Sequence, residues 1–148
     1  MKKLVLVCLA VMGGMLSMAQ STVNWTYSAK KTCDKTYEVH IVATIGRGWH
    51  LYSQTTPEGG PVPTSFTFNK NPLLKLEGGV KEVGKIHVKH EEVFGIDTKF
   101  YSDKVVFVQK VSLKNNAKTK LTGTLEYMVC NDTQCLPPTT VNFAVSLN

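Results

Sequence analysis

The sequence predicts an all-β protein, an immunoglobulin-like antiparallel β-sandwich, on the basis of three observations. Apolar and polar residues alternate strictly over residues 36–45 and 104–113, as in strands that bury one face. About eight or nine short segments of this kind follow one another, separated by turn residues at fairly regular spacing. No segment shows the apolar repeat of an amphipathic helix. The combination is typical of a sandwich domain.

Residues 1–19 have the pattern of a secretory signal peptide. A basic start is followed by an apolar run over residues 4–16, and small residues stand at Ser17 and Ala19 before the expected cleavage site. We therefore expect export, cleavage after Ala19 and one mature domain over residues 20–148. No segment of that domain is long and apolar enough to span a membrane.

The first half of the mature domain is predicted to contain short strands separated by loops. The polar stretch 30–35 is expected to form the turn after the first strand and to expose Cys33. Residues 56–63 cannot form regular structure, because proline lacks an amide donor and glycine is costly to order. Strands are expected before residue 30 and over 36–45, 65–69 and 73–77, the last ended by Gly78 and Gly79, with a short apolar segment at 49–52.

The second half is predicted to hold the longer strands. Residues 86–90 are short and β-like, and residues 90–95 have the character of a loop that carries one large apolar residue. Strands are expected over 104–113, 120–130 and 141–147, with a turn at 114–116. Apolar residues fall on alternate positions of these strands, so one face of each should be buried.

Charge and motif content argue against several classes of function. The chain has 17 Lys and Arg residues against 11 Asp and Glu, and the lysines are scattered along the sequence. A nucleic-acid surface usually concentrates basic residues with aromatics between them, so we expect no nucleic-acid partner. No Ser-His-Asp pattern, paired-carboxylate motif or phosphate loop stands out, which argues against hydrolase and nucleotide chemistry.

Two cysteines, Cys130 and Cys135, are the candidate catalytic residues. In the predicted strand 120–130, apolar residues such as Val129 share the core face, while Cys130 points the other way, towards solvent or a cover. A reactive cysteine fits that position better than an inert one. In an extended chain the two Cα atoms would lie about 16 Å apart, whereas a disulfide needs about 7 Å or less. Residues 131–134 favour turns and are predicted to form the hairpin loop between them.

A disulfide between these cysteines would be either a redox switch or a structural staple. A closed loop of about six residues contributes about 2 kcal/mol of stability, against about 5 kcal/mol for a loop of about 100. A domain of this size does not depend on so weak a staple, which favours the switch. Pro137 and Pro138 cannot donate to a sheet ladder, so the backbone beside Cys135 is left available to a partner, unless the prolines simply end a strand.

A metal site is a third interpretation of the same cysteines. Thiolates of Cys130 and Cys135 together with a histidine could bind zinc or copper. A closed zinc site needs four ligands, however, and no second Cys or His pair stands at a matching spacing. We therefore expect neither a metal nor a cofactor, since thiol–disulfide exchange requires none.

Five segments together carry a family resemblance. They are residues 48–54 (GWHLYSQ), 59–61 (GGP), 90–95 (HEEVFG), 100–101 (FY) and 127–138 (YMVCNDTQCLPP). The sequence resembles the N-terminal periplasmic domain of the thiol:disulfide interchange protein DsbD, in the short stand-alone form of Bacteroidetes-type bacteria. The cysteine segment with its Leu-Pro-Pro tail is the most specific of the five.

The resemblance implies both a fold and an activity. The family fold is an immunoglobulin-like sandwich with an inserted hairpin that carries two cysteines. Its dithiol receives electrons from a thioredoxin-like domain that is fed by a membrane-embedded conductor. It passes them to periplasmic thioredoxin-fold proteins, such as disulfide isomerases and cytochrome c maturation factors. By this resemblance Cys135 forms the mixed disulfide with partners, and Cys130 resolves it.

The resemblance also implies a cover over the two cysteines. Phe94 matches the tip of a cap loop that shields the pair until a partner opens it, and Glu92 lies beside this tip. His50 and Tyr52 match aromatic residues that line the site in the family.

The same resemblance bears on the expected partners and on Cys33, the third cysteine of the mature domain. Because the chain ends at Asn148 without a thioredoxin-like domain, we expect the electron donor to be a separate, membrane-embedded protein. Cys33 has no counterpart that we can place. The alternative interpretation is a redox-inert immunoglobulin-like binding module whose Cys130–Cys135 disulfide is structural.

Overall fold

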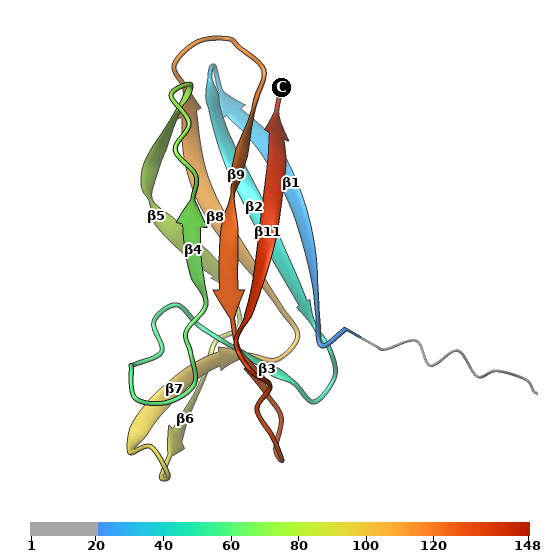
Figure 1. Ribbon diagram of the computed structural model, residues 1–148, viewed down its shortest axis with the longest axis vertical. Helices are drawn as coiled ribbons and strands as arrows, with labels where there is room; N and C mark the ends of the chain where they lie inside the picture. The colour runs from blue at the N-terminus through green and yellow to red at the C-terminus, as the bar shows by residue number, and fades with distance from the viewer. Residues whose placement is uncertain (1–20) are drawn as a thin grey trace, which may run out of the picture.

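The computed structural model describes residues 21–148, which form eleven strands (Figure 1). In chain order these are β1 (Val23–Cys33), β2 (Thr36–Ile45), β3 (His50–Tyr52), β4 (Ser65–Phe68), β5 (Leu74–Gly84), β6 (His87–Glu91), β7 (Ile96–Tyr101), β8 (Lys104–Leu113), β9 (Thr119–Tyr127), β10 (Val129–Cys130) and β11 (Thr139–Leu147). Within residues 21–148 we find no helix with the length and apolar character to cross a membrane. The predicted signal peptide, residues 1–19 with cleavage after Ala19, lies outside the described residues.

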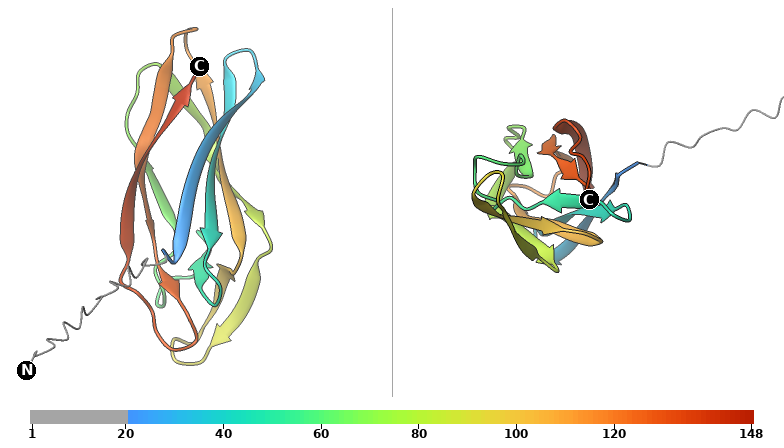
Figure 2. Two further views of the ribbon diagram at one scale, coloured as in Figure 1. Left: turned by 90° about the vertical axis from the view of Figure 1, so that its right-hand side faces the viewer. Right: turned by 90° about the horizontal axis from the view of Figure 1, so that it is seen from below.

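Two antiparallel sheets packed face to face form the sandwich, and the predicted immunoglobulin-like fold class is confirmed. One sheet has the strand order β1-β2-β8-β5, and the other has the order β11-β9-β4. The left view of Figure 2 shows the orange and red strands β9 and β11 as one layer and the blue and cyan strands β1 and β2 as the other.

The core lies between these sheets because apolar side chains occupy alternate positions of their strands. Ile41 of β2 pairs in register with Phe107 of β8, and both are fully buried. The Phe107 ring lies 6.0 Å from Trp25 of its own sheet and 5.0 Å from Phe66 of the opposite sheet. Burial of one such aromatic side chain is worth about 1.5–3 kcal/mol, so this cluster fixes how the two layers pack.

A small sheet of order β10-β3-β7-β6 closes one end of the sandwich (Figure 1). Val129 pairs with Leu51, and Leu51 pairs with Tyr101; all three side chains belong to the buried core. The neighbouring pair, Cys130 opposite His50, points to the other face, because side chains alternate along a strand. One face of the small sheet is thus fixed to the core, and the opposite face carries the cysteine.

The predicted end of the strand at Gly78 and Gly79 is wrong. Strand β5 continues to Gly84, with a shift of register between Glu77 and Lys81. Gly78 has a φ of 70°, a conformation that glycine adopts without strain. The glycines therefore form an irregularity within the strand rather than its end.

Two further differences concern where strands begin and end. β1 continues through most of the predicted turn 30–35, and the chain turns only at Asp34 and Lys35. β7 has no counterpart among the predicted strands, because its polar residues, Asp97 and Lys99 among them, hide the apolar alternation. Cys33 is exposed, as predicted, but as the last residue of β1.

The predicted strand 120–130 is in fact two strands, β9 and β10, with a break at Met128. β9 pairs with β11 and β4 in the sandwich, whereas β10 pairs with β3 in the small sheet. The buried positions Tyr127 and Val129 keep their spacing across the break, which is why the sequence pattern does not reveal it. The change of sheet carries Cys130 out of the main core.

Gly123 of β9 occupies a position where the fold has no room for a side chain. A β-carbon there would overlap the backbone carbonyl oxygen of Thr67 and lie 2.9 Å from the Phe143 ring. At Gly79, by contrast, a β-carbon would meet nothing within 4 Å.

Gly123→Ala is therefore expected to lower the free energy of unfolding by about 3 kcal/mol, because the clash is with backbone that cannot move aside. Gly79→Ala is the matched control and should change it by less than about 1 kcal/mol. Urea denaturation followed by tryptophan fluorescence measures both variants. Equal losses of stability in the two variants would contradict this account of the packing.

Candidate functional site

The two candidate cysteines form a disulfide across a hairpin that follows β10. Cys130 and Cys135 are bonded, with Cα atoms 4.0 Å apart, and they face each other as an isolated antiparallel bridge. Residues 131–134 form the predicted loop, in which Asn131 N–H donates to the Gln134 carbonyl oxygen at 2.8 Å. Asn131 Oδ1 also accepts hydrogen bonds from the backbone N–H groups of Thr133 and Gln134, at 2.9 and 2.8 Å. These hydrogen bonds therefore hold the conformation of the loop in addition to the disulfide.

The two cysteines differ sharply in accessibility. Cys130 is 4% exposed, although it is not part of the main core cluster. Cys135 is exposed, at the outer side of the hairpin. Of the two predicted environments for Cys130, solvent or a cover, the structure has the cover. An incoming group from solvent meets Cys135 first.

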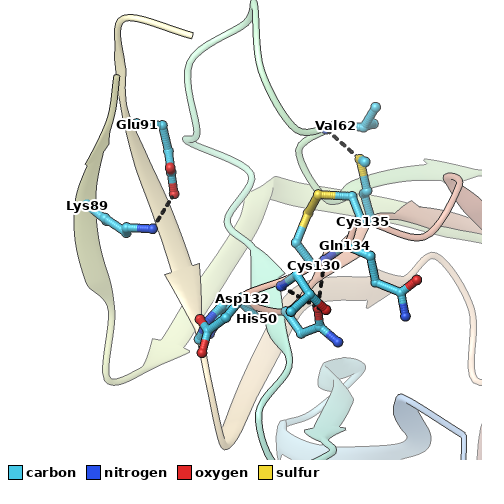
Figure 3. The surroundings of a disulfide bond; sticks show 11 residues. His50, Val62, Lys89, Glu91, Cys130, Asp132, Gln134 and Cys135 are labelled. Carbon is cyan, nitrogen blue, oxygen red and sulfur yellow. Dashed lines mark hydrogen bonds and ion pairs between the residues drawn. A yellow bond between two sulfur atoms is a disulfide. The ribbon is translucent and has the colours of Figure 1, made fainter. Parts of the chain in front are cut away.

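A cavity of about 320 Å³ opens beside the disulfide. Both cysteines line it, together with His50, Tyr52, Pro61, Lys89, Glu91, Phe94, Phe100, Asn131 and Asp132. Figure 3 shows the disulfide with His50 and Asp132 nearby and the Lys89–Glu91 pair on β6. The residues from β3, β6, β7 and β10 occupy alternate positions in register, so one face of the small sheet forms much of the wall.

The structure brings the predicted residues His50 and Tyr52 to this wall. His50 is the cross-strand neighbour of Cys130, and its ring centroid lies 4.4 Å from that of Phe100. Tyr52 is buried and pairs with Phe100 on β7. Burial raises the pKa of Tyr52, and the negative charge of Glu91 raises it further. Tyr52 is therefore a neutral hydroxyl at the cavity wall at physiological pH.

Phe94 lines the same cavity from the turn that joins β6 and β7. The turn is closed by hydrogen bonds from the N–H groups of Phe94 and Gly95 to the Glu91 carbonyl oxygen, at 3.1 and 2.8 Å. Phe94 itself remains 48% exposed. A β-carbon placed on Gly60 would lie 3.5 Å from the Phe94 ring and 2.8 Å from Ile96. Gly60 thus leaves room for the Ile96 side chain, and the Phe94 ring lies beside it at a distance that a β-carbon would tolerate.

Glu92, the other residue predicted beside the cap tip, is exposed and is not among the residues that line the cavity. Its neighbour Glu91 lines the wall instead and forms an ion pair with Lys89 at 3.1 Å. The reason is alternation: Glu91 and Lys89 lie on the same face of β6, whereas Glu92 lies in the turn beyond it.

Sequence reasoning missed Lys89, Glu91 and the role of Glu82. Recognition of β7 as the partner of β6 would have placed Lys89, Glu91 and Phe100 on one face. Glu82 of β5 accepts hydrogen bonds from Ser53 Oγ, the Gln54 N–H and the Tyr101 hydroxyl, each at 2.7 Å. It ties the loop after β3 to two other strands, and no local pattern in the sequence signals this. Burial and the bond to Glu82 raise the pKa of Tyr101 well above its usual range.

Two further observations bear on alternative sites. Within residues 21–148 there is no group of three or more His, Cys, Asp or Glu side chains placed to hold a metal ion. A larger hollow of about 470 Å³ lies between β4 and β5, lined by Phe68, Leu74, Leu76 and Leu121 among others, and it shares no residue with the cysteine cavity. Its lining contains no cysteine.

Comparison with known proteins gives one family. The family model described as "Thiol:disulfide interchange protein DsbD, N-terminal" matches residues 18–147. No curated protein sequence matches the chain.

Solved structures of low sequence identity share the fold. The N-terminal periplasmic domain of ScsB from Proteus mirabilis is similar with a TM-score of 0.57 and 18% identity over 90% of this chain, which spans 49% of that structure's chain. The DsbD N-terminal domain of Neisseria meningitidis in the reduced form has a TM-score of 0.52 and 20% identity, covering 84% of this chain and 86% of that one. The structure of a complex between the Neisseria meningitidis DsbD and PilB N-terminal domains has a TM-score of 0.53 and 15% identity. The match covers 88% of this chain and 87% of that one.

Reduction of the Cys130–Cys135 bond is expected to leave the domain folded and to lower its free energy of unfolding by only about 2 kcal/mol, because the bond closes a short loop. Urea denaturation of the oxidised and the reduced protein measures the difference. A Cys33→Ser variant serves as the control, since Cys33 is exposed and free and its loss should leave the difference unchanged. Unfolding of the domain upon reduction would contradict the prediction.

Proposed function

The chain belongs to the family of DsbD N-terminal domains, since that family model matches residues 18–147, and on this premise we propose that it is a periplasmic dithiol carrier. As a disulfide it accepts two electrons from a thiol donor. As a dithiol it passes them to another protein's disulfide. The Cys130–Cys135 pair is the proposed site of both reactions.

The observation that carries this proposal is the unequal accessibility of a locally closed disulfide. Cys135 is exposed, whereas Cys130 is 4% exposed and lies behind it. This difference supports the proposal that Cys135 forms the mixed disulfide with a partner and that Cys130 resolves it. The hydrogen bonds of residues 131–134 hold the hairpin in place when the sulfur bond opens.

The exchange is balanced without a cofactor. The Cys135 thiolate attacks one sulfur of the acceptor's disulfide, and the acceptor's other sulfur leaves as a thiolate. The Cys130 thiolate then attacks Cys135 Sγ, and the acceptor's first sulfur leaves in turn. The acceptor has gained two electrons, and the Cys130–Cys135 disulfide has re-formed. A donor dithiol reverses these steps by attacking Cys135 Sγ, which expels Cys130 as a thiolate.

Phe94 is the proposed cover of the pair. It lines the cavity from a short turn in which the preceding residue, Val93, is 89% exposed. Phe94 is only half-buried, so displacing it exposes little apolar surface and costs little free energy. Such a cover would keep small thiol reductants away from the disulfide and would be displaced by a partner protein that contacts the turn. His50 and Tyr52 complete the lining, and Glu92 is proposed as part of the turn's outer surface.

The proposed partners follow from the family and its relatives. A related DsbD N-terminal domain is described in complex with the PilB N-terminal domain. We assign to this chain thioredoxin-fold periplasmic acceptors, such as disulfide isomerases and proteins of cytochrome c maturation, and a membrane-embedded electron donor. The periplasmic location is supported by the relative described as the N-terminal periplasmic domain of ScsB.

Trapping tests the assignment of the two cysteines. In a Cys33→Ser background, Cys130→Ala is expected to hold an oxidised thioredoxin-fold protein as a stable mixed disulfide through Cys135, because no resolving thiol remains. Non-reducing electrophoresis and mass spectrometry identify the linked cysteine. Cys135→Ala is the matched control and should trap at least about tenfold less, since Cys130 is buried.

Failure of both single variants to trap any thioredoxin-fold protein would refute the proposal. A reduction potential of the wild-type pair below about −300 mV would point the same way, because cellular thiols do not open such a bond. The protein would then be the redox-inert binding module.

Phe94→Ala is expected to speed reduction of the disulfide by a thiol protein about tenfold, because it removes roughly 1–2 kcal/mol of contact that keeps the cavity covered. Stopped-flow measurement of the reduction rate tests this. Val93→Ala on the same turn is the control and should leave the rate unchanged, since Val93 is 89% exposed. Equal rates for wild type and Phe94→Ala would remove Phe94 from the mechanism.

A further inference from the structure

We propose that His50 is the charge and proton partner of Cys130, the buried cysteine of the pair. This inference rests on the proposed function, in which Cys130 alternates between a disulfide sulfur and a thiolate. A thiolate formed at a nearly inaccessible sulfur needs a positive neighbour, because burial disfavours the charged form. His50 is the residue placed to supply that charge.

The register of the small sheet places the two side chains together. Cys130 and His50 are directly opposed in the β10–β3 pair. Side chains that are opposed in an antiparallel pair point to the same face, with Cβ atoms about 4.5–5.5 Å apart. Both residues line the 320 Å³ cavity. The histidine therefore faces the same enclosed space as the sulfur that becomes a thiolate.

The imidazole is held in position from three sides. His50 Nδ1 lies 3.2 Å from Ser102 Oγ, within hydrogen-bond distance. The ring packs against Phe100, with centroids 4.4 Å apart. His50 Nε2 lies 3.9 Å from Asp132 Oδ1, in the loop between the two cysteines. The side chain of Asp132 is 96% exposed to solvent, so its charge interaction with His50 is strongly screened.

The other charged groups around the cavity do not replace this pairing. Lys89 and Glu91 line the cavity from β6 but form an ion pair with each other at 3.1 Å. Arg47 shares a neighbouring hollow with Asp132 and lines none of the cysteine cavity. Tyr52 stays neutral because burial raises its pKa.

His87 provides an internal comparison for His50. It also contacts Phe100, with ring centroids 5.4 Å apart, but on the far side, from β6. Two strands, β3 and β7, separate β6 from β10 in the sheet. At about 4.8 Å per strand, His87 lies roughly 14 Å from Cys130. The two histidines thus share an aromatic neighbour but not the cysteine.

The chemistry assigned to His50 has two parts. When a donor thiolate attacks Cys135 Sγ, the disulfide breaks and its electron pair goes to Cys130 Sγ. The His50 imidazolium stabilises that thiolate or transfers its proton to it, becoming neutral imidazole. When Cys130 later attacks Cys135 Sγ to release the acceptor, the imidazole takes the proton back from the thiol. Imidazole is suited to this because it changes charge near neutral pH.

The first test titrates the Cys130 thiol directly. In a Cys33→Ser, Cys135→Ser background, thiolate absorbance in the ultraviolet reports Cys130. We expect His50→Gln to raise the titration midpoint of Cys130 by about one pH unit, because a neighbouring positive charge is lost. His50→Lys should restore the low midpoint, since it keeps the charge. His87→Gln is the matched control and should leave the midpoint where it was.

The second test uses the wild-type chain and needs no substitution at the site. Coupling between two groups is reciprocal, so a Cys130 thiolate should in turn favour the imidazolium of His50. The NMR titration midpoint of the His50 ring is expected to be higher in the reduced than in the oxidised protein, with no such difference for His87.

The outcomes separate this inference from the proposed function. A shift in both titrations supports the pairing even if no partner is trapped through Cys135. Identical midpoints for His50→Gln and wild type, or for the His50 ring in the two redox states, would overturn it even if trapping succeeds. A purely structural His50 would alter stability but move neither midpoint.

Discussion

The pairing of Val129 with Leu51 is the contact on which the site depends. Both side chains are buried in the main core, so the small sheet cannot shift along the sandwich without breaking the core. Because side chains alternate along each strand, fixing this pair inward forces the next pair, Cys130 and His50, outward to the cavity. A slip of one residue would exchange the two faces and put the cysteine into the core.

The same constraint places the buried Cys130 outside the sandwich interior. Cys130 lines the cavity and does not belong to the core cluster between the two large sheets. The small sheet and the turn between β6 and β7 lie at one end of the molecule (Figure 1). In the proposed exchange these elements rearrange while the packing around Phe107 is unchanged. The proposed chemistry and the main core therefore occupy different parts of one small domain.

Much of this arrangement could be predicted from the sequence, and the features that could not be predicted were missed for identifiable physical reasons. Strict alternation over residues 36–45 and 104–113 gave the bounds of β2 and β8, and the turn residues 131–134 gave the cysteine hairpin. Alternation could not reveal the change of sheet at Met128, because the period is unbroken there. It could not place Lys89 and Glu91 on the wall, because β7 is too polar to be recognised. The hydrogen bonds to Glu82 join distant segments and leave no local trace.

The position of Cys33 has a consequence for oxidative folding. It ends β1 at the hairpin tip, whereas the disulfide lies at the other end of the sandwich (Figure 1). The ten residues of β2 alone separate these ends by about 33 Å. In the folded protein the Cys130–Cys135 disulfide therefore cannot exchange for a bond to Cys33, since the Cys33 thiol cannot cross that span without unfolding of the domain. Thiol chemistry at Cys33 is therefore confined to encounters between molecules.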